Sequence, residues 1–376
     1  MDKVKRQYMT KHSLFVYVGT FSEAGSMSVT PSTGIFIFRL SLEDGSLSLV
    51  GTASETLNTS FLTIDLPHHC LYVANEVNEF MGQYGGVASA FAIHPRDGTL
   101  TFLNHQSTHG GASCYASTDQ DHRFLLVANY FGASVSVFPI LANGELAPLS
   151  GFRQLAASSV NLNQPPASTP HSIIMDNSNR FALVADSSAD KILVFLLDKN
   201  SGQLTPNAFP WVKVRPGAGP RHMIFDKSGH FLYTTNERNS TVGVFAWDGV
   251  KGTLNEIQTL PMLPENFKDP NLAADIHLTP SGKFLYASNR GHDSLVVYSV
   301  EPQSGLLTFL GHVPTHGQVP RNFAIDPTGT YLVVGNQISH NLVTFRIDPD
   351  NGRLVETGNS AEVLLPVCVQ IVDLHT

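Results

Sequence analysis

One short phrase recurs seven times along the chain, at intervals of about fifty residues. Each copy contains an acidic, polar or lysine residue, then glycine, any residue and leucine. Successive glycines are separated by 53, 46, 58, 50, 53 and 47 residues, and they are Gly45, Gly98, Gly144, Gly202, Gly252, Gly305 and Gly352. An internal period of this length predicts an array of similar supersecondary units, because one such unit cannot bury its apolar face alone.

Each repeat is predicted to contain two β-hairpins. An aromatic residue six or seven positions before the glycine lies in a run of β-branched and aromatic residues, as in TVGVFAW at 241–247, and such runs favour strands. The glycine then supplies a turn, because it tolerates the positive φ of tight hairpins. Upstream, an Asp or Thr precedes an Asn or Asp by ten residues in six copies, which begin at Asp65, Asp119, Asp176, Asp226, Thr279 and Asp326. Four antiparallel strands per repeat, which we name a to d, predict a β-propeller blade.

The two ends of the chain complete the count of strands. The run LFVYVGT at 14–20 provides a strand b without a strand a, and PVCVQIVD at 366–373 provides a strand a without a strand b. Pairing them closes the ring and leaves few open sheet edges. We therefore predict an all-β, seven-bladed β-propeller whose N- and C-terminal strands share one blade. It forms a single domain over 14–376, preceded by a polar N-terminal extension over 1–13.

Composition excludes several classes of partner. The net charge is −8, from 23 basic and 31 acidic residues, without a basic cluster, which argues against binding to nucleic acid or an anionic membrane. No apolar run is long enough to span a membrane, and three cysteines without metal spacing fit a reduced compartment, so we expect a cytoplasmic protein. We expect no cofactor and no metal, because phosphate-cradling loops, GxSxG and HExxH are absent from the sequence. The oligomeric state is left open.

The register of the repeat predicts a site. Strand a runs antiparallel to strand b, so the start of a and the end of b lie at the same end of each blade. A purely structural repeat would carry similar residues at these positions in every blade. Instead the positions hold diverse ionisable residues, chiefly in the fourth to seventh units: His171, Arg221, His222, Glu237, Asp275, Arg290 and Arg321. We predict that these side chains surround one mouth of the central channel.

Such a cluster could bind and process an anion. Arginine offers a planar, permanently charged fork for carboxylate or phosphate, and Glu or His can transfer protons. Structural interpretations compete with this one. A single Arg or Glu at a blade end is often a surface ion pair, His222 and Asp275 could be hydrogen-bonded neighbours that line the channel, and His171 could be a satisfied strand-end histidine.

The sequence resembles the lactonase family of seven-bladed propellers, which includes the propeller-type 6-phosphogluconolactonase. The matching phrases extend over the chain and are YVGTF (17–21), VANE (73–76), LLVANYF (125–131), PGAGPRHMIFD (216–226), TTNERNSTV (234–242), YASNRGHDS (286–294), PRNFAIDPTG (320–329) and PVCV near the end. A related fungal carboxymuconate cyclase has a proposed site of one His, one Glu and two Arg, which corresponds here to His171, Glu237, Arg221 and Arg290. This chain departs from many relatives at Ile173, and from some at Tyr115, where those relatives carry histidine.

The resemblance implies a lactone hydrolase that converts 6-phosphogluconolactone to 6-phosphogluconate, a step of the pentose phosphate pathway. Glu237 or His171 would be the base, and Arg221 or Arg290 would stabilise the oxyanion. The small anionic sugar-lactone or carboxylate substrate is expected to contact His222, Asp275, Arg321, Gln337 and Glu76.

Two alternatives stay open, a cycloisomerase of the carboxymuconate type at the same site and a non-catalytic interaction scaffold. A calcium-dependent, six-bladed gluconolactonase is disfavoured by the count of seven and by the lack of a carboxylate-rich metal set. The long segments 76–87, 156–169 and 261–272 are expected to be loops, and the first two are candidate lids.

Overall fold

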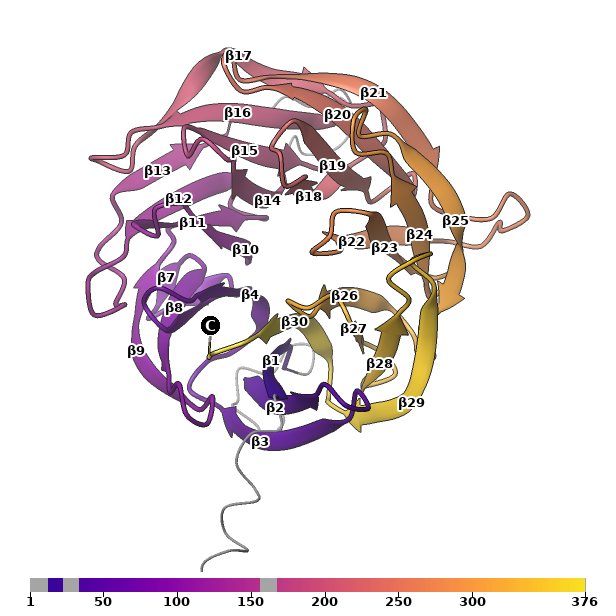
Figure 1. The fold of residues 1–376 in the computed structure, drawn as a ribbon. Coiled ribbons are helices and arrows are strands. Elements are labelled where there is room, and N and C mark those ends of the chain that lie inside the picture. Colours follow the sequence, from indigo (N-terminus) through magenta and orange to yellow (C-terminus); the bar gives the residue numbers. More distant parts are fainter. Residues whose placement is uncertain (1–12, 23–33, 156–167, 376) are drawn as a thin grey trace, which may run out of the picture.

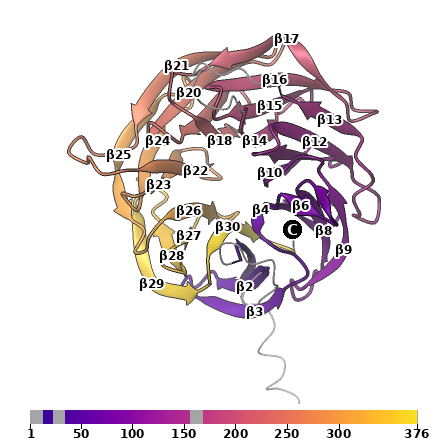
Figure 2. The same ribbon diagram turned by 180° about the vertical axis from the view of Figure 1, so that it is seen from behind.

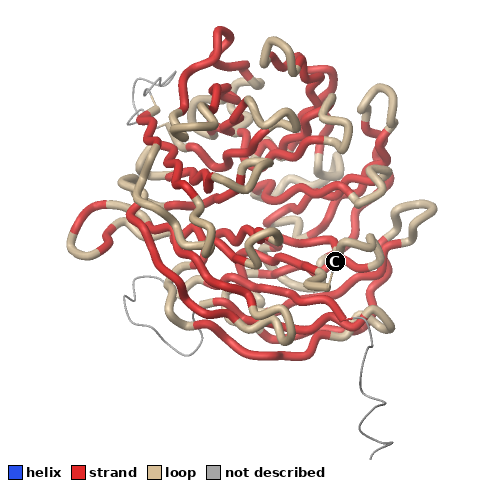
Figure 3. Tube along the Cα trace, turned by 60° about the vertical axis from the view of Figure 1, so that its left-hand side comes forward, coloured by secondary structure: helices blue, strands red, loops and turns tan. Residues whose placement is uncertain are grey.

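Seven four-stranded antiparallel sheets surround a central channel in the computed structural model, which describes residues 13–22, 34–155 and 168–375. Figure 1 shows the sheets arranged as blades, and Figure 2 shows the same ring from behind. Strands and loops account for all the described residues, and none of these residues forms a helix (Figure 3). The predicted all-β, seven-bladed propeller is therefore confirmed.

The strands succeed one another from the channel outward in every blade. The innermost strands are β4 (Thr59–Asp65), β10 (Ser113–Thr118), β14 (Pro170–Met175), β18 (Pro220–Phe225), β22 (Leu272–Leu278), β26 (Pro320–Ile325) and β30 (Pro366–Val372). The second strands are β5 (Cys70–Asn75), β11 (Phe124–Asn129), β15 (Phe181–Asp186), β19 (Phe231–Asn236), β23 (Phe284–Arg290), β27 (Tyr331–Asn336) and β1 (Ser13–Thr20).

The third strands are β2 (Ile35–Ser41), β8 (Val87–Ile93), β12 (Ser134–Pro139), β16 (Lys191–Leu197), β20 (Thr241–Asp248), β24 (Ser294–Val300) and β28 (Asn341–Ile347). The outermost strands are β3 (Leu47–Ala53), β9 (Leu100–Ser107), β13 (Gly151–Gln154), β17 (Leu204–Lys213), β21 (Thr253–Pro261), β25 (Leu307–Pro314) and β29 (Leu354–Glu362). A separate small hairpin, β6 (Glu79–Phe80) and β7 (Gln83–Tyr84), lies between β5 and β8.

The closing blade combines the two ends of the chain, as predicted. Its order is β3, β2, β1 and β30, and β1 pairs antiparallel with β30 through partners such as Val18 and Val369. The extension expected over 1–13 lies outside the described residues, except for Ser13 at the start of β1. The domain boundaries at 14–376 stay a prediction.

The recurring glycine has a packing role between blades. All seven glycines have φ between +69° and +83°, a region that side chains with a Cβ rarely adopt. In most blades an aromatic ring from the neighbouring blade also covers the glycine, and a Cβ on Gly98 would come within 2.2 Å of the Phe15 ring. Tyr17 adds a hydrogen bond from its hydroxyl to the Gly98 carbonyl, 2.8 Å away. The repeat in the sequence therefore marks the positions where one blade docks on the next.

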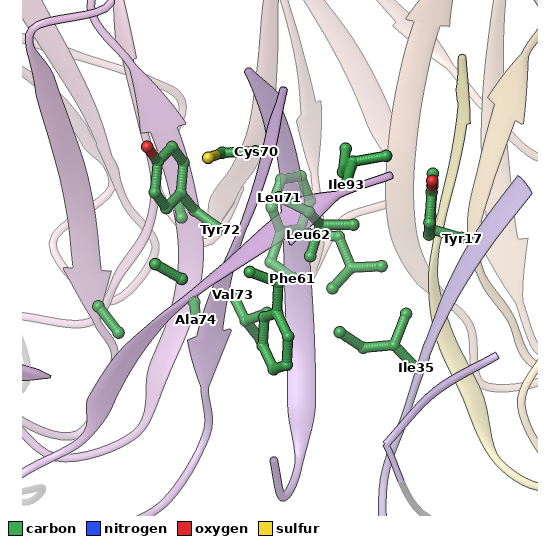
Figure 4. Close-up of a cluster of buried hydrophobic side chains, with 14 of the residues drawn as sticks. Tyr17, Ile35, Phe61, Leu62, Cys70, Leu71, Tyr72, Val73, Ala74 and Ile93 are labelled. Carbon is green, nitrogen blue, oxygen red and sulfur yellow. The ribbon is translucent and has the colours of Figure 1, made fainter. Parts of the chain in front are cut away.

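The apolar core lies between the blade faces. The second strands β5, β11, β15 and β27 are buried along their entire length, whereas most residues of an outer strand such as β29 are exposed or half-buried. Figure 4 shows part of one shared cluster, in which Leu62 and Leu71 of one blade face Tyr17 and Ile35 of the closing blade, while Tyr72 points the other way. Burial of this kind stabilises the ring by about 25 cal/mol per Å² of apolar surface.

Hydrogen bonds also link the seven innermost strands around the channel. Each neighbouring pair is joined by at least one bond that involves a side chain. The links are Thr63 to Ala116, Ser117 to Ile173, Ser172 to Arg221, His222 to Asp275, Asn322 to Asp275, Val369 to Asn322, and Leu62 to Cys368. The channel wall is therefore a closed polar belt, and three of its links involve residues of the predicted site.

Candidate active site

Local irregularities at the start of the innermost strands present the candidate side chains. The pairing of β14 with β15 shifts between Pro170 and Ser172, so His171 has no partner residue across the ladder. In β18 the shift between Pro220 and Met223 leaves out both Arg221 and His222. Asp275 and Arg321 occupy equivalent shifts in β22 and β26. Bulges of this kind redirect side chains, and here they occur at the positions that the register predicted.

An ion-pair cluster occupies the centre of this mouth. Glu237 follows β19, and its Oε1 accepts a hydrogen bond from Nη2 of Arg290, the last residue of β23. The same oxygen lies 3.6 Å from Nε of Arg221. The Arg221, Glu237 and Arg290 side chains are only 2%, 14% and 11% exposed. The structure therefore gathers three of the four residues proposed for catalysis into one buried unit.

Both guanidinium groups retain unused donors. Arg290 Nη2 also donates to the Ala273 carbonyl, 3.0 Å away, but Nε of Arg290 and Nε of Arg221 have no hydrogen-bond partner within the described residues. A buried donor without a partner is costly. The two guanidinium groups therefore keep donor capacity for an anionic or carbonyl oxygen.

The protonation states follow from burial and neighbouring charge. Burial raises the pKa of Glu237, but the Arg221 and Arg290 charges outweigh it, and the net pKa lies below the usual value. Burial, followed by repulsion from Arg290, lowers the pKa of Arg221 to about 9. At neutral pH the cluster consists of one carboxylate and two guanidinium cations.

His171 is the fourth residue of the predicted catalytic set. Its ring is buried and makes edge-to-face contacts with Tyr130 and His222, at centroid distances of 5.3 and 5.5 Å. Its Nδ1 lies 3.9 Å from the Cys114 thiol. Burial, followed by repulsion from Arg221, places the His171 pKa well below its usual value, so at neutral pH the imidazole is uncharged and has a lone pair available.

His222 and Asp275, predicted to bind substrate, are engaged within the protein. Nδ1 of His222 lies 2.7 Å from Asp275 Oδ1, and Nε2 lies 3.2 Å from Arg221 Nη1. Asp275 Oδ2 accepts further hydrogen bonds from Asn322 and from His277. Both residues are 4% exposed or less. The structure gives neither side chain a polar atom that is free of protein partners.

The remaining predicted substrate contacts lie at the edge of the mouth. Arg321 Nη2 is 3.6 Å from Glu76 Oε2, and the guanidinium is stacked over Phe21 at 5.1 Å. Glu76 also accepts a hydrogen bond from Ser60 at 2.6 Å. Gln337 follows β27 at the position equivalent to Glu237, and it is half-buried. The charge of Arg321, like those of Arg221 and Arg290, lowers the pKa of Glu237.

Sequence reasoning missed two members of the network, His277 and Asn322. His277 lies two residues after Asp275 in β22. Side chains two residues apart in a strand point to the same face, so this spacing could have placed His277 beside Asp275. Of the two candidate lids, 76–87 carries the β6–β7 hairpin. Most of 156–169 lies outside the described residues.

A cavity opens at the opposite end of the channel. It has a volume of about 540 Å³ and is lined by later residues of the innermost strands, including Thr63, Ser117, His277 and Gln370, with Phe61 and Tyr115 at its inner end. The Phe61 and Tyr115 rings are stacked, with centroids 4.0 Å apart. Among the described residues, no arginine or lysine lines this cavity. The arginine-rich mouth is therefore the better site for an anion.

Two further observations concern metals and membranes. Within residues 13–22, 34–155 and 168–375, no three His, Cys, Asp or Glu side chains are grouped so that they could hold a metal ion. Over the same residues, no helix is long and apolar enough to cross a membrane.

The fold and the mouth define a class of protein, the seven-bladed propellers with ionisable side chains gathered at one end of the channel. Within this class, the family described as "Lactonase, 7-bladed beta-propeller" matches residues 15–371. The chain therefore belongs to the seven-bladed β-propeller lactonase family, and by class it is a lactone hydrolase.

Individual relatives agree with this assignment. A 6-phosphogluconolactonase from Bacillus subtilis is 34% identical over 319 residues, which cover 85% of this chain and 86% of the relative. One from Formosa agariphila is 33% identical over 314 residues, or 83% of this chain and 86% of the relative. The solved structure of a periplasmic gluconolactonase from Pseudomonas aeruginosa superposes with a TM-score of 0.87 at 33% identity, and the match covers 96% of this chain and 99% of that one.

Proposed function

We propose that the protein hydrolyses 6-phosphogluconolactone to 6-phosphogluconate, a reaction of the pentose phosphate pathway. The proposal rests on the position of Glu237, which is buried between Arg221 and Arg290. The Nε atoms of these two arginines have no hydrogen-bond partner within the described residues. The names of the Bacillus and Formosa relatives support the choice of lactone. The substrate is thus a small anionic sugar lactone.

The central cluster supplies both charge stabilisation and proton transfer. A water molecule attacks the lactone carbonyl, and Glu237 removes its proton. As Glu237 becomes neutral, negative charge appears on the carbonyl oxygen, so Arg221 and Arg290 exchange one anion for another. One well-aimed donor of this kind contributes on the order of 3–4 kcal/mol to transition-state stabilisation.

Ring opening completes the reaction. The tetrahedral intermediate collapses, the bond to the ring oxygen breaks, and Glu237 returns its proton to the departing oxygen. His171, uncharged at neutral pH because its pKa is lowered, accepts a hydrogen bond from the attacking water and orients it. Acid–base catalysis of this type contributes roughly 10²–10⁴ in rate.

The edge of the mouth recognises the rest of the substrate. Arg321 is proposed to bind the phosphate, because it is the third cation of this mouth and its ion pair with Glu76 is long, at 3.6 Å. Glu76 and Gln337 are proposed to contact sugar hydroxyls. No step in this mechanism uses a metal ion.

Hydrolysis of 6-phosphogluconolactone by purified protein tests the proposal. Glu237→Gln and Arg290→Ala are expected to lose most of the activity, while Arg346→Ala, on the exposed face of β28, is the matched control for loss of an arginine. Full activity in both mouth variants would exclude the assignment.

A cycloisomerase acting on a carboxymuconate would use the same anion-binding arginines, so both substrates belong in the assay. Turnover of the carboxymuconate alone would favour that alternative. Turnover of neither, combined with a protein partner that binds the same mouth, would favour the scaffold.

A cytoplasmic location is proposed from the three cysteines, which are buried and form no disulfide. The Pseudomonas relative is periplasmic, so cell fractionation is the appropriate test. Recovery of the protein with periplasmic markers would contradict the proposed location.

A further inference from the structure

The contact between Arg221 and His222 restricts the histidine to one protonation state. Nη1 of Arg221 lies 3.2 Å from Nε2 of His222, and both side chains are buried. A guanidinium can only donate hydrogen bonds, so Nε2 has to present its lone pair. His222 is therefore uncharged and carries its proton on Nδ1.

Asp275 fixes that proton from the other side. Its Oδ1 accepts from His222 Nδ1 at 2.7 Å. Its Oδ2 accepts from three donors, His277 Nε2 at 2.9 Å, Asn322 Nδ2 at 2.5 Å and the Phe323 amide at 3.2 Å. All four partners donate, three to Oδ2 and one to Oδ1, so Asp275 is held as an anion that only accepts.

The network is anchored in the channel wall. His277 belongs to β22, like Asp275, and Asn322 belongs to β26. Asn322 Oδ1 in turn accepts a hydrogen bond from the Val369 amide of β30, 2.6 Å away. The acceptor offered to Arg221 is thus fixed by three strands other than its own.

We propose that Asp275 and His222 form a positioning pair for Arg221, in which Asp275 fixes the His222 tautomer and His222 Nε2 holds the guanidinium in place for the reaction. Neither residue contacts the substrate. The inference deepens the proposed function and rests on it for the role of Arg221. The tautomer itself does not depend on that function.

The asymmetry of the Asp275 contacts makes Asp275→Asn a specific test. An asparagine would turn its oxygen toward the three donors on the Oδ2 side and its NH₂ group toward His222. His222 Nδ1 would then have to accept, which moves the ring proton to Nε2, against the donors of Arg221. Arg221 loses its acceptor although the shape of the side chain at position 275 is unchanged.

The first measurement is ¹⁵N NMR of full-length protein labelled at histidine, with the His222 signals assigned by their loss in His222→Gln. We expect a neutral His222 with its proton on Nδ1 in the wild type, and on Nε2 in Asp275→Asn. A wild-type His222 that is doubly protonated, or protonated on Nε2, would overturn the proposal regardless of any activity.

The second measurement is lactone hydrolysis by four variants. Arg221→Ala, His222→Phe and Asp275→Asn are each expected to lower kcat about 10²-fold, the cost of losing one oriented donor. His222→Gln should recover at least tenfold of that loss, because its amide can donate to Asp275 and accept from Arg221. Full kcat in His222→Phe with loss in Arg221→Ala would also overturn the proposal.

The two measurements separate this inference from the proposed function. If the wild type turns over no lactone while NMR shows the Nδ1 tautomer and its shift in Asp275→Asn, the proposed function fails and the positioning pair stands.

Discussion

Arg290 donates a hydrogen bond to Glu237 across the boundary between two blades, although the two residues are 53 positions apart. That separation equals the interval between the repeat glycines Gly252 and Gly305 in the same two blades. The pair therefore joins equivalent positions of adjacent repeats, and the repeat that builds the fold also brings these two charges together.

Glu237→Gln tests the central carboxylate. We expect kcat to fall by roughly 10²–10⁴ because the proposed base is lost. Thermal stability should also fall, since Arg221 and Arg290 would lose their counter-charge in a buried environment. Steady-state kinetics and thermal unfolding measure the two effects, with Arg346→Ala as the control. Unchanged kcat would remove Glu237 from the mechanism.

Arg321→Ala tests recognition of the phosphate. We expect KM for 6-phosphogluconolactone to rise at least tenfold, while kinetics on unphosphorylated gluconolactone change little. Comparing the two substrates separates loss of a phosphate contact from general damage to the mouth. An equal loss on both substrates would assign Arg321 to the reaction centre instead.

Stability should decrease as the pH falls below about 6.5. Burial, followed by repulsion from Arg221, lowers the pKa of His222 from 6.5 to about 4, so the unfolded chain binds a proton that the folded chain does not. His222 therefore contributes stability above pH 6.5 that is lost as the pH falls toward 4. Urea unfolding at several pH values should show this slope, and His222→Gln should reduce it. If stability depends on pH in the same way in His222→Gln as in the wild type, the lowered pKa of His222 is contradicted.

Gly98→Ala tests the docking role of the repeat glycine. An alanine at a positive φ costs roughly 1–2 kcal/mol, and at Gly98 its Cβ would also meet the Phe15 ring at 2.2 Å. Gly282 has a similar φ of +72° with open space around it, so Gly282→Ala isolates the backbone cost. We expect Gly98→Ala to be destabilised by roughly 1–3 kcal/mol more than Gly282→Ala in urea unfolding. Equal losses would exclude the packing role.

Deleting residues 363–376 tests the closing blade. The deletion removes β30, exposes the edge of β1 and breaks the bond from Val369 to Asn322. A lower melting temperature and a greater tendency to aggregate are expected. Unchanged thermal unfolding would mean that the ring does not depend on its terminal strand.

The sequence was sufficient for the fold and for bringing Arg221, Glu237 and Arg290 together, whereas it missed His277 and Asn322. The glycine period set the number of blades, and the antiparallel register placed Arg221, Glu237 and Arg290 at one end. Both inferences use positions along the backbone, which a regular repeat specifies closely.

Pairing between side chains could not be predicted in the same way. The sequence suggested substrate contacts for His222 and Asp275, whereas their polar atoms are occupied by Arg221, His277 and Asn322. Which atoms meet depends on rotamers and on the separation of blades, and the repeat determines neither. The bulges at the strand starts were also absent from the prediction, because a one-residue slip leaves no clear signal in the sequence.

The bulged starts of the innermost strands separate the chemistry of this protein from its framework. His171 and Arg221 stand where the ladder skips a residue, so the ladder hydrogen bonds of their blades do not pass through them. Exchanging a side chain at such a position changes the chemistry of the mouth without removing a ladder hydrogen bond. Such a scaffold can diversify in specificity while it keeps its architecture.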